Sequence, residues 1–216
     1  MINAVLFDLD GTLLDTADDL SASLNHVLIQ HGLPTIDNAI ARPLASDGAK
    51  GLLELGFGDL LPQFDYEELR ASFLQYYDEN IAVNTQLYSG IEQLIASLDK
   101  AVIPWGIVTN KPEALAKKLI AYYPALKNSK VLFGGDSLPQ RKPDPMPIIL
   151  ACDQLSATPE NTLYVGDALR DIQASNSAKS PSVVANWGYI KATDDVSKWQ
   201  ANYIADTPGE ILQLIN

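Results

Sequence analysis

Two aspartates separated by a single residue directly follow the first apolar segment of the chain. Residues 4–7 read Ala-Val-Leu-Phe, and residues 8–12 read Asp-Leu-Asp-Gly-Thr. An apolar run that ends in turn residues predicts a buried strand, and side chains alternate along a strand, so Asp8 and Asp10 can serve one site at its carboxyl end. Carboxylates this close repel each other, so we expect a cation or a group to be attacked. An acidic surface turn is the alternative.

Two later segments could bind the phosphate of a substrate. Thr109 and Asn110 close a strand predicted for residues 103–109, just before a helix whose first backbone N–H groups favour an anion. Helix capping is an equal alternative for Thr109. Lys142 lies in a stiff segment of sequence Arg-Lys-Pro-Asp-Pro, and its ammonium near Asp8 would offset repulsion between carboxylate and phosphate. A surface lysine is the alternative there.

A last pair of carboxylates follows the strand predicted for residues 162–165. Asp167 comes after a glycine, and Asp171 lies four residues further on, so a helix would place both on one face. Carboxylate oxygens without His or Cys suit Mg²⁺, which also binds substrate phosphate. Helix-dipole capping could explain either aspartate alone, but it does not explain both together with Asp8 and Asp10.

These four segments match, in order and spacing, the four motifs of the haloacid-dehalogenase-like superfamily, which they resemble over essentially the whole chain. The resemblance implies that Asp8 attacks phosphorus and that Asp10 serves as general acid and base. It also implies Mg²⁺ held by Asp8, the Asp10 carbonyl and Asp167, with support from Asp171. The phosphoryl oxygens would be bound by Thr109, Asn110 and Lys142.

Two positions depart from the superfamily pattern. Ala168 stands where many relatives carry Asp or Ser, and Lys179 stands where relatives usually have a glycine that ends the helix. Neither position touches the expected chemistry directly.

Further marks resemble the phosphoglycolate-phosphatase-like branch, namely the segments Val-Thr-Asn-Lys-Pro at 108–112 and Trp-Gly-Tyr at 187–189. Within that branch, the segment 105–112 and the acidic and aromatic tail residues are most similar to phosphatases acting on N-acetylmuramic acid 6-phosphate in cell-wall recycling. Those tail residues are Asp194, Asp195, Trp199, Ala201 and Asp206. Phosphoglycolate is the alternative substrate. A phosphomutase, a dehalogenase or a non-catalytic binding module is a weaker alternative.

The hydrophobic pattern predicts a doubly wound, Rossmann-like parallel sheet with a helical insertion. Residues 84–216 alternate between strand and helix patterns, whereas residues 16–83 show helical spacing without a convincing strand. We therefore expect a catalytic core of residues 1–15 and 84–216 and a helical cap of residues 16–83. A capping box is predicted at Thr16 to Asp19, at the start of the first helix.

The cap is expected to recognise the part of the substrate beyond the phosphate. Candidates are Arg42, Ser46, Gly48 and Lys50, because a helix starts near residue 48 and its amino terminus favours a carboxylate. Arg42 and Lys50 are equally explained as solvated helix charges.

Composition limits the possible partners and environments. The 216 residues carry a formal net charge of −12, which argues against binding a nucleic-acid backbone. Cys152 is the only cysteine and lies in an apolar run, so it is expected in the core rather than as a reactive thiol. No targeting segment or long apolar stretch is recognised, so we expect a cytoplasmic monomer or weak homodimer that acts on a small molecule away from membranes.

Overall fold

A parallel sheet forms the centre of the protein in the computed structural model, which describes residues 2–215. Among these residues the main sheet has six strands in the order β5-β4-β1-β6-β7-β8, and every neighbouring pair is parallel. The strands are β1 (Ala4–Phe7), β4 (Trp105–Val108), β5 (Leu132–Phe133), β6 (Thr162–Gly166), β7 (Ser182–Ala185) and β8 (Tyr203–Ala205). Their carboxyl ends share one edge, as predicted for a doubly wound sheet.

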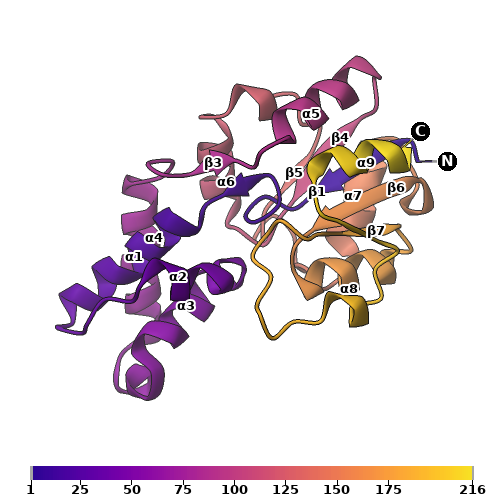
Figure 1. The fold of residues 1–216 in the computed structure, drawn as a ribbon. Coiled ribbons are helices and arrows are strands. Elements are labelled where there is room, and N and C mark those ends of the chain that lie inside the picture. The colour runs from indigo at the N-terminus through magenta and orange to yellow at the C-terminus, as the bar shows by residue number, and fades with distance from the viewer. Residues whose placement is uncertain (1, 216) are drawn as a thin grey trace. The chain divides into compact units, whose positions relative to one another are not determined.

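Helices cover both faces of this sheet (Figure 1). They are α5 (Ile91–Lys100), α6 (Glu113–Ile120), α7 (Met146–Gln154), α8 (Leu169–Ala178) and α9 (Pro208–Ile215). The chain adds β4 and then β5 on one side of β1, and afterwards adds β6, β7 and β8 on the other side. Because the crossovers are right-handed, this change of direction places α7 and α8 on the face opposite to α5 and α6. Consistent with this, α5 packs against α9 and α7 packs against α8. The predicted α/β fold is confirmed.

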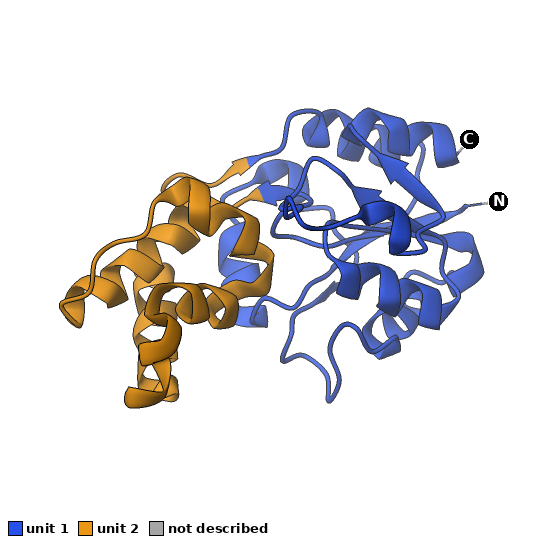
Figure 2. Cartoon of the chain, turned by 60° about the horizontal axis from the view of Figure 1, so that its bottom comes forward, with its two compact units in different colours: residues 1–14, 87–216 blue, residues 15–86 orange. Residues whose placement is uncertain are grey.

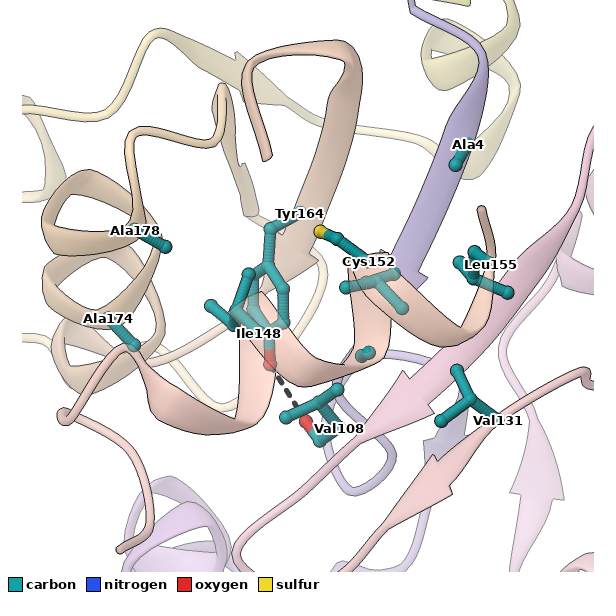
Figure 3. Packing of buried hydrophobic residues seen from close by; sticks show 11 residues of the cluster. Ala4, Val108, Val131, Ile148, Cys152, Leu155, Tyr164, Ala174 and Ala178 are labelled. Atoms are coloured by element: carbon teal, nitrogen blue, oxygen red, sulfur yellow. Dashed lines mark hydrogen bonds between the residues drawn. The ribbon is translucent and has the colours of Figure 1, made fainter. Parts of the chain in front are cut away.

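One face of the sheet packs on α7 through a buried apolar cluster (Figure 3). Leu6, Val108 and Tyr164 come from three neighbouring strands, and Ile148 and Cys152 come from α7. The Cys152 side chain is fully buried, and this burial raises the pKa of its thiol. Cys152 is therefore a core residue, as expected.

The chain divides into two compact units, residues 1–14 with 87–216 and residues 15–86 (Figure 2). The second unit holds the helices α1 (Ala17–Gln30), α2 (Asn38–Ala41), α3 (Gly48–Phe57) and α4 (Tyr66–Glu79), together with the 3-10 segments Arg42–Asp47 and Gly58–Gln63. α1 packs against α3 and α4. The strands β2 (Leu14–Asp15) and β3 (Gln86–Leu87) pair where the chain passes between the units. No helix in residues 2–215 is long and apolar enough to span a membrane.

The capping box predicted at Thr16 is wrong. Thr16 makes no side-chain cap to α1, and the carboxylate of Asp19 faces the other end of the insertion instead. It accepts hydrogen bonds from the backbone N–H and side-chain amide of Asn84, at 2.9 Å and 3.0 Å, and from the backbone N–H and hydroxyl of Thr85, at 3.0 Å and 2.7 Å. Asp19 thereby ties the first residues of the helical unit to its last residues.

Candidate active site

Asp8 directly follows β1 and points into a buried cluster at the carboxyl edge of the sheet. Its side chain is 4% exposed. One carboxylate oxygen, Oδ1, accepts a hydrogen bond from the Leu9 backbone N–H at 2.7 Å, and the other, Oδ2, lies 3.1 Å from the Lys142 ammonium. Because β1 lies between β4 and β6, both neighbouring strand ends bring side chains to this carboxylate.

The Lys142 ammonium is the positive centre of this cluster. Its side chain is fully buried, and Nζ lies 2.7 Å from Asp171 Oδ1 and 2.8 Å from both the Val108 carbonyl oxygen and the Tyr164 hydroxyl. The Tyr164 hydroxyl in turn donates to the Val108 carbonyl (Figure 3). Burial, followed by the charges of Asp171 and Asp8, raises the pKa of Tyr164 well above its ordinary value. Tyr164 therefore remains a phenol that accepts from Lys142 and donates to Val108.

Asp167 and Asp171 complete a group of three buried carboxylates with Asp8. One oxygen from each of the three lies within 4.8 Å of the others. Asp167 accepts from the Thr12 hydroxyl at 3.3 Å and the Tyr189 backbone N–H at 3.0 Å. Burial raises the pKa of Asp171, and the charge of Asp8 adds to this, while Lys142 opposes it.

A helical face does not explain why Asp167 and Asp171 are close. Helix α8 begins at Leu169, so Asp167 lies in the turn before it, and only Asp171 is helical. Asp171 instead folds back across that turn and accepts a hydrogen bond from the Ala168 backbone N–H at 2.9 Å. Asp167 and Asp171 therefore do not share a helical face, contrary to the prediction from their spacing. Helix α8 ends at Ala178, and the next residue, Lys179, is in the left-handed region at φ 63°.

The carboxylate cluster fits a hard divalent cation such as Mg²⁺. Three carboxylates supply oxygen ligands of the kind that Mg²⁺ prefers. Two glycines let the backbone approach Asp167 closely: a Cβ on Gly11 would lie 2.2 Å from Asp167 Oδ2, and one on Gly188 would lie 2.3 Å from Asp167 Cβ. Gly11 also has φ +81°, which favours glycine.

Thr109 and Asn110 lie at the end of β4 and contact the lysine segment. The Thr109 hydroxyl accepts from the Lys111 backbone N–H at 3.2 Å, and the Asn110 amide donates to the Lys142 carbonyl at 2.9 Å. Helix α6 begins only at Glu113. Thr109 therefore does not cap that helix, and the alternative prediction of a capping role for Thr109 is wrong.

Sequence reasoning missed the partner of Asp10. The Lys111 ammonium lies 3.0 Å from Asp10 Oδ1 and 3.3 Å from Oδ2, and the Lys111 side chain is 5% exposed. In the sequence Lys111 stands out only as part of the branch signature, because nothing local links it to an aspartate 101 positions earlier. Tyr164 was missed for the same reason, since it reads as an ordinary strand residue.

The candidate residues of the helical unit have different surroundings. Arg42 is half-exposed and forms ion pairs with Asp15 and, at 3.4 Å, with Asp18. Lys50 is 73% exposed and lies 3.9 Å from Glu54 one turn away. Gly48 begins α3 with φ +62°, and a Cβ there would meet nothing within 4 Å. Ser46 is half-buried in the 3-10 segment before it.

The chain therefore has a Rossmann-like α/β fold, with a carboxylate cluster and a buried lysine at the carboxyl edge of its sheet. The chain belongs to the haloacid dehalogenase-like hydrolase family, whose model matches residues 5–185. The resemblance inferred from the motifs is therefore confirmed.

Several proteins similar to this chain are named phosphatases. The chain is 39% identical to an N-acetylmuramic acid 6-phosphate phosphatase of Pseudomonas aeruginosa, over 100% of this chain and 95% of that protein. It is 41% identical to a phosphoglycolate phosphatase of Xanthomonas campestris, over 96% and 94%. The crystal structure of a predicted phosphoglycolate phosphatase from Haemophilus somnus superimposes on this chain with a TM-score of 0.90 at 26% identity, over 100% of this chain and 98% of that one. The chain is accordingly a phosphoric monoester hydrolase.

Proposed function

We propose that this chain is a magnesium-dependent phosphatase that hydrolyses a small-molecule phosphate monoester through a phosphorylated Asp8. The observation that carries the proposal is the placement of Asp8. It is a buried carboxylate with one oxygen held by a backbone N–H and the other next to a buried ammonium. This arrangement orients a nucleophile and offsets its repulsion with an incoming phosphate.

In the first step an Asp8 oxygen forms a bond to phosphorus while the bond from phosphorus to the ester oxygen breaks. The leaving oxygen takes a proton from the Asp10 carboxyl group. Lys142, Thr109 and the Asn110 backbone would bind the phosphoryl oxygens as negative charge builds on them.

In the second step water completes the hydrolysis. Asp10, now a carboxylate, takes a proton from water as the water oxygen forms a bond to phosphorus. The bond between phosphorus and Asp8 breaks, which releases inorganic phosphate and restores both carboxyl groups to their starting states. One side chain thus acts as acid and then as base.

Mg²⁺ would be held by Asp8, Asp167 and the Asp10 carbonyl, with Asp171 supporting the group. When bound, the ion would neutralise charge on the phosphoryl group and the carboxylates. The burial and spacing of Asp8, Asp167 and Asp171 support this assignment.

For the substrate we favour N-acetylmuramic acid 6-phosphate, with phosphoglycolate as the second candidate. Relatives of about equal identity carry each name, at 39% and 41%. Two observations support N-acetylmuramic acid 6-phosphate. The relative with that name matches 100% of this chain, and the acidic and aromatic tail residues noted above resemble those of such phosphatases. Both molecules carry a carboxylate as well as a phosphate ester. In phosphoglycolate the carboxylate is one carbon from the ester oxygen, whereas in N-acetylmuramic acid 6-phosphate it lies across the sugar ring, so the position of a carboxylate-binding group would distinguish the two substrates.

We further propose that residues 15–86 select the substrate. Gly48 and Lys50 are the favoured contacts, because Gly48 opens a ten-residue helix and Lys50 is well exposed. Arg42 would first have to leave Asp15 and Asp18 before it bound a substrate carboxylate.

Trapping of the intermediate tests the proposed mechanism. Acid quenching during turnover, followed by borohydride reduction, should convert part of Asp8 into homoserine, which peptide mass spectrometry detects. The Asp8→Asn protein should be inactive and show no conversion. Full hydrolysis by Asp8→Asn would overturn the covalent mechanism.

Specificity constants test the substrate choice. We expect kcat/KM for N-acetylmuramic acid 6-phosphate to exceed that for phosphoglycolate, and Lys50→Ala to reduce the larger value by roughly 10-fold or more, as for the loss of one charge-assisted hydrogen bond. para-Nitrophenyl phosphate, which has no carboxylate, is the control and should be little affected. An equal loss on both substrates would remove Lys50 from substrate recognition.

A further inference from the structure

The loop between β4 and α6 holds a buried lysine that the mechanism above does not use. Lys111 is 9% exposed as a residue, and its ammonium contacts both carboxylate oxygens of Asp10, at 3.0 Å and 3.3 Å. Its backbone is held on both sides, since its N–H donates to the Thr109 hydroxyl and its carbonyl accepts from the Gly135 backbone N–H at 2.9 Å. A lysine fixed in this way has little freedom to serve as a mobile surface charge.

Asp10 needs such a partner because it lies beyond the end of β1. Strand β1 ends at Phe7. The backbone of Asp10 forms an isolated bridge with Leu14, and the Gly11 N–H donates to the Leu14 carbonyl oxygen at 2.9 Å. These contacts hold the backbone of Asp10 and leave the rotation of its side chain to other groups. The Lys111 ammonium contacts both carboxylate oxygens of Asp10 and so restrains the rotation of this side chain.

We propose that Lys111 is a positioning residue that holds the Asp10 carboxyl group where it can reach the leaving oxygen and then the attacking water. This inference rests on the proposed function. Proton transfer requires heavy atoms within about 2.6–3.2 Å of each other, and a displacement of about 1 Å can cost roughly 100-fold in rate. A carboxyl oxygen that accepts from Lys111 keeps a further position, so the same oxygen can carry the proton that it gives to the leaving oxygen and can then accept a proton from water.

Direct binding of the substrate is the competing role for Lys111. A lysine that bound the phosphoryl group or a substrate carboxylate would contribute to KM and would act whether or not Asp10 were present. A lysine that acts through Asp10 would contribute to kcat, and its effect would disappear once Asp10 had lost its function.

The central experiment is a double-mutant cycle on the full-length protein. Lys111→Met keeps the apolar stem and removes the charge, and it is made alone and together with Asp10→Asn. Lys117→Met, which removes an exposed lysine from α6, is the matched control for loss of one positive charge. kcat and KM are measured with para-nitrophenyl phosphate, because this activated ester needs the least help in leaving and so keeps the turnover of the Asp10→Asn proteins measurable.

Lys111→Met should lower kcat by roughly 10- to 100-fold with KM nearly unchanged, while Lys117→Met has no effect. In the Asp10→Asn background the same change should alter kcat by less than about twofold, because the effects of coupled residues are not additive. A rise in KM at constant kcat, or an equal loss in both backgrounds, would overturn the positioning role.

A chemical rescue separates charge from packing. Lys111→Cys treated with 2-bromoethylamine carries a lysine-like side chain, and Cys152 is fully buried and should not react in the folded protein. Recovery of most of kcat supports the proposal, and failure of the modified protein to recover, with its melting temperature intact, refutes it. If Asp10→Asn alone kept wild-type kcat, the proposed acid and base role would fail instead, which this design distinguishes.

Discussion

Replacing Lys142 by methionine should destabilise the metal-free protein through the carboxylates that it leaves behind. The side chain is fully buried, and its ammonium lies 3.1 Å from Asp8 and 2.7 Å from Asp171. Removing one partner of a buried ion pair typically costs about 3–5 kcal/mol, because the remaining charge stays buried without compensation. For a chain of this size that corresponds to a fall of roughly 6–20 °C in Tm.

The loss should depend on pH in a defined direction. Burial already raises the pKa of Asp171 above 3.8, Asp8 adds to this, and Lys142 and Arg170 oppose it. Without Lys142 the pKa of Asp171 in the folded state rises further, and each pKa unit corresponds to about 1.4 kcal/mol of lost stability of the folded protein with ionised Asp171. As pH rises, the Asp171 carboxyl group loses its proton at a lower pH in the unfolded chain than in the folded protein. The folded state therefore loses stability from about pH 4 until the raised pKa of Asp171 is passed. Lys142→Met should therefore cost less at pH 5 than at pH 8.

Urea unfolding in EDTA at these two pH values measures the effect, with the fluorescence of buried Trp105 as one reporter. Asp171→Asn is the matched background, and there the cost of Lys142→Met should shrink because one buried charge is gone. A cost that is equal at both pH values and equal in the two backgrounds would refute the electrostatic reasoning. It would assign the effect to lost packing of the lysine stem.

Four further predictions follow from the same structure. Mg²⁺ added to EDTA-treated protein should raise Tm in calorimetry, and Asp167→Asn should remove most of that rise; no rise in the wild type would contradict the metal assignment. Gly11→Ala should cost more than about 1 kcal/mol in the free energy of unfolding, because φ is +81° and the new Cβ would lie 2.2 Å from Asp167; an unchanged urea midpoint would contradict this. Asp19→Ala should cost more than about 2 kcal/mol, since four donors lose their acceptor, and urea unfolding would expose a smaller loss. Cys152 should not react with a thiol reagent in the native protein, because burial raises its pKa, and it should react fully in urea; rapid native labelling would contradict its core position.

The sequence by itself determined the strand ends and the residues that gather there. β1 lies at the predicted residues 4–7, and β6 spans Thr162–Gly166, where a strand is predicted for residues 162–165. Local chain geometry explains this success, because alternation and turn residues report which segments are buried and where a strand stops. Parallel strands bring their carboxyl ends to one edge, so the sequence predicts that Asp8, Thr109 and Asp167 share that edge, while Lys142 was added by the resemblance.

Only the tertiary structure decided which polar groups meet. Asp19 reads as part of a helix cap, yet its carboxylate accepts from Asn84 and Thr85 at the far end of the insertion. Lys111 pairs with Asp10, and Tyr164 supports Lys142, although nothing in the spacing of these residues connects them. The physical reason is that periodicity reports burial along one segment, whereas a buried charge or hydroxyl takes whichever partner the packed chain brings within about 3 Å.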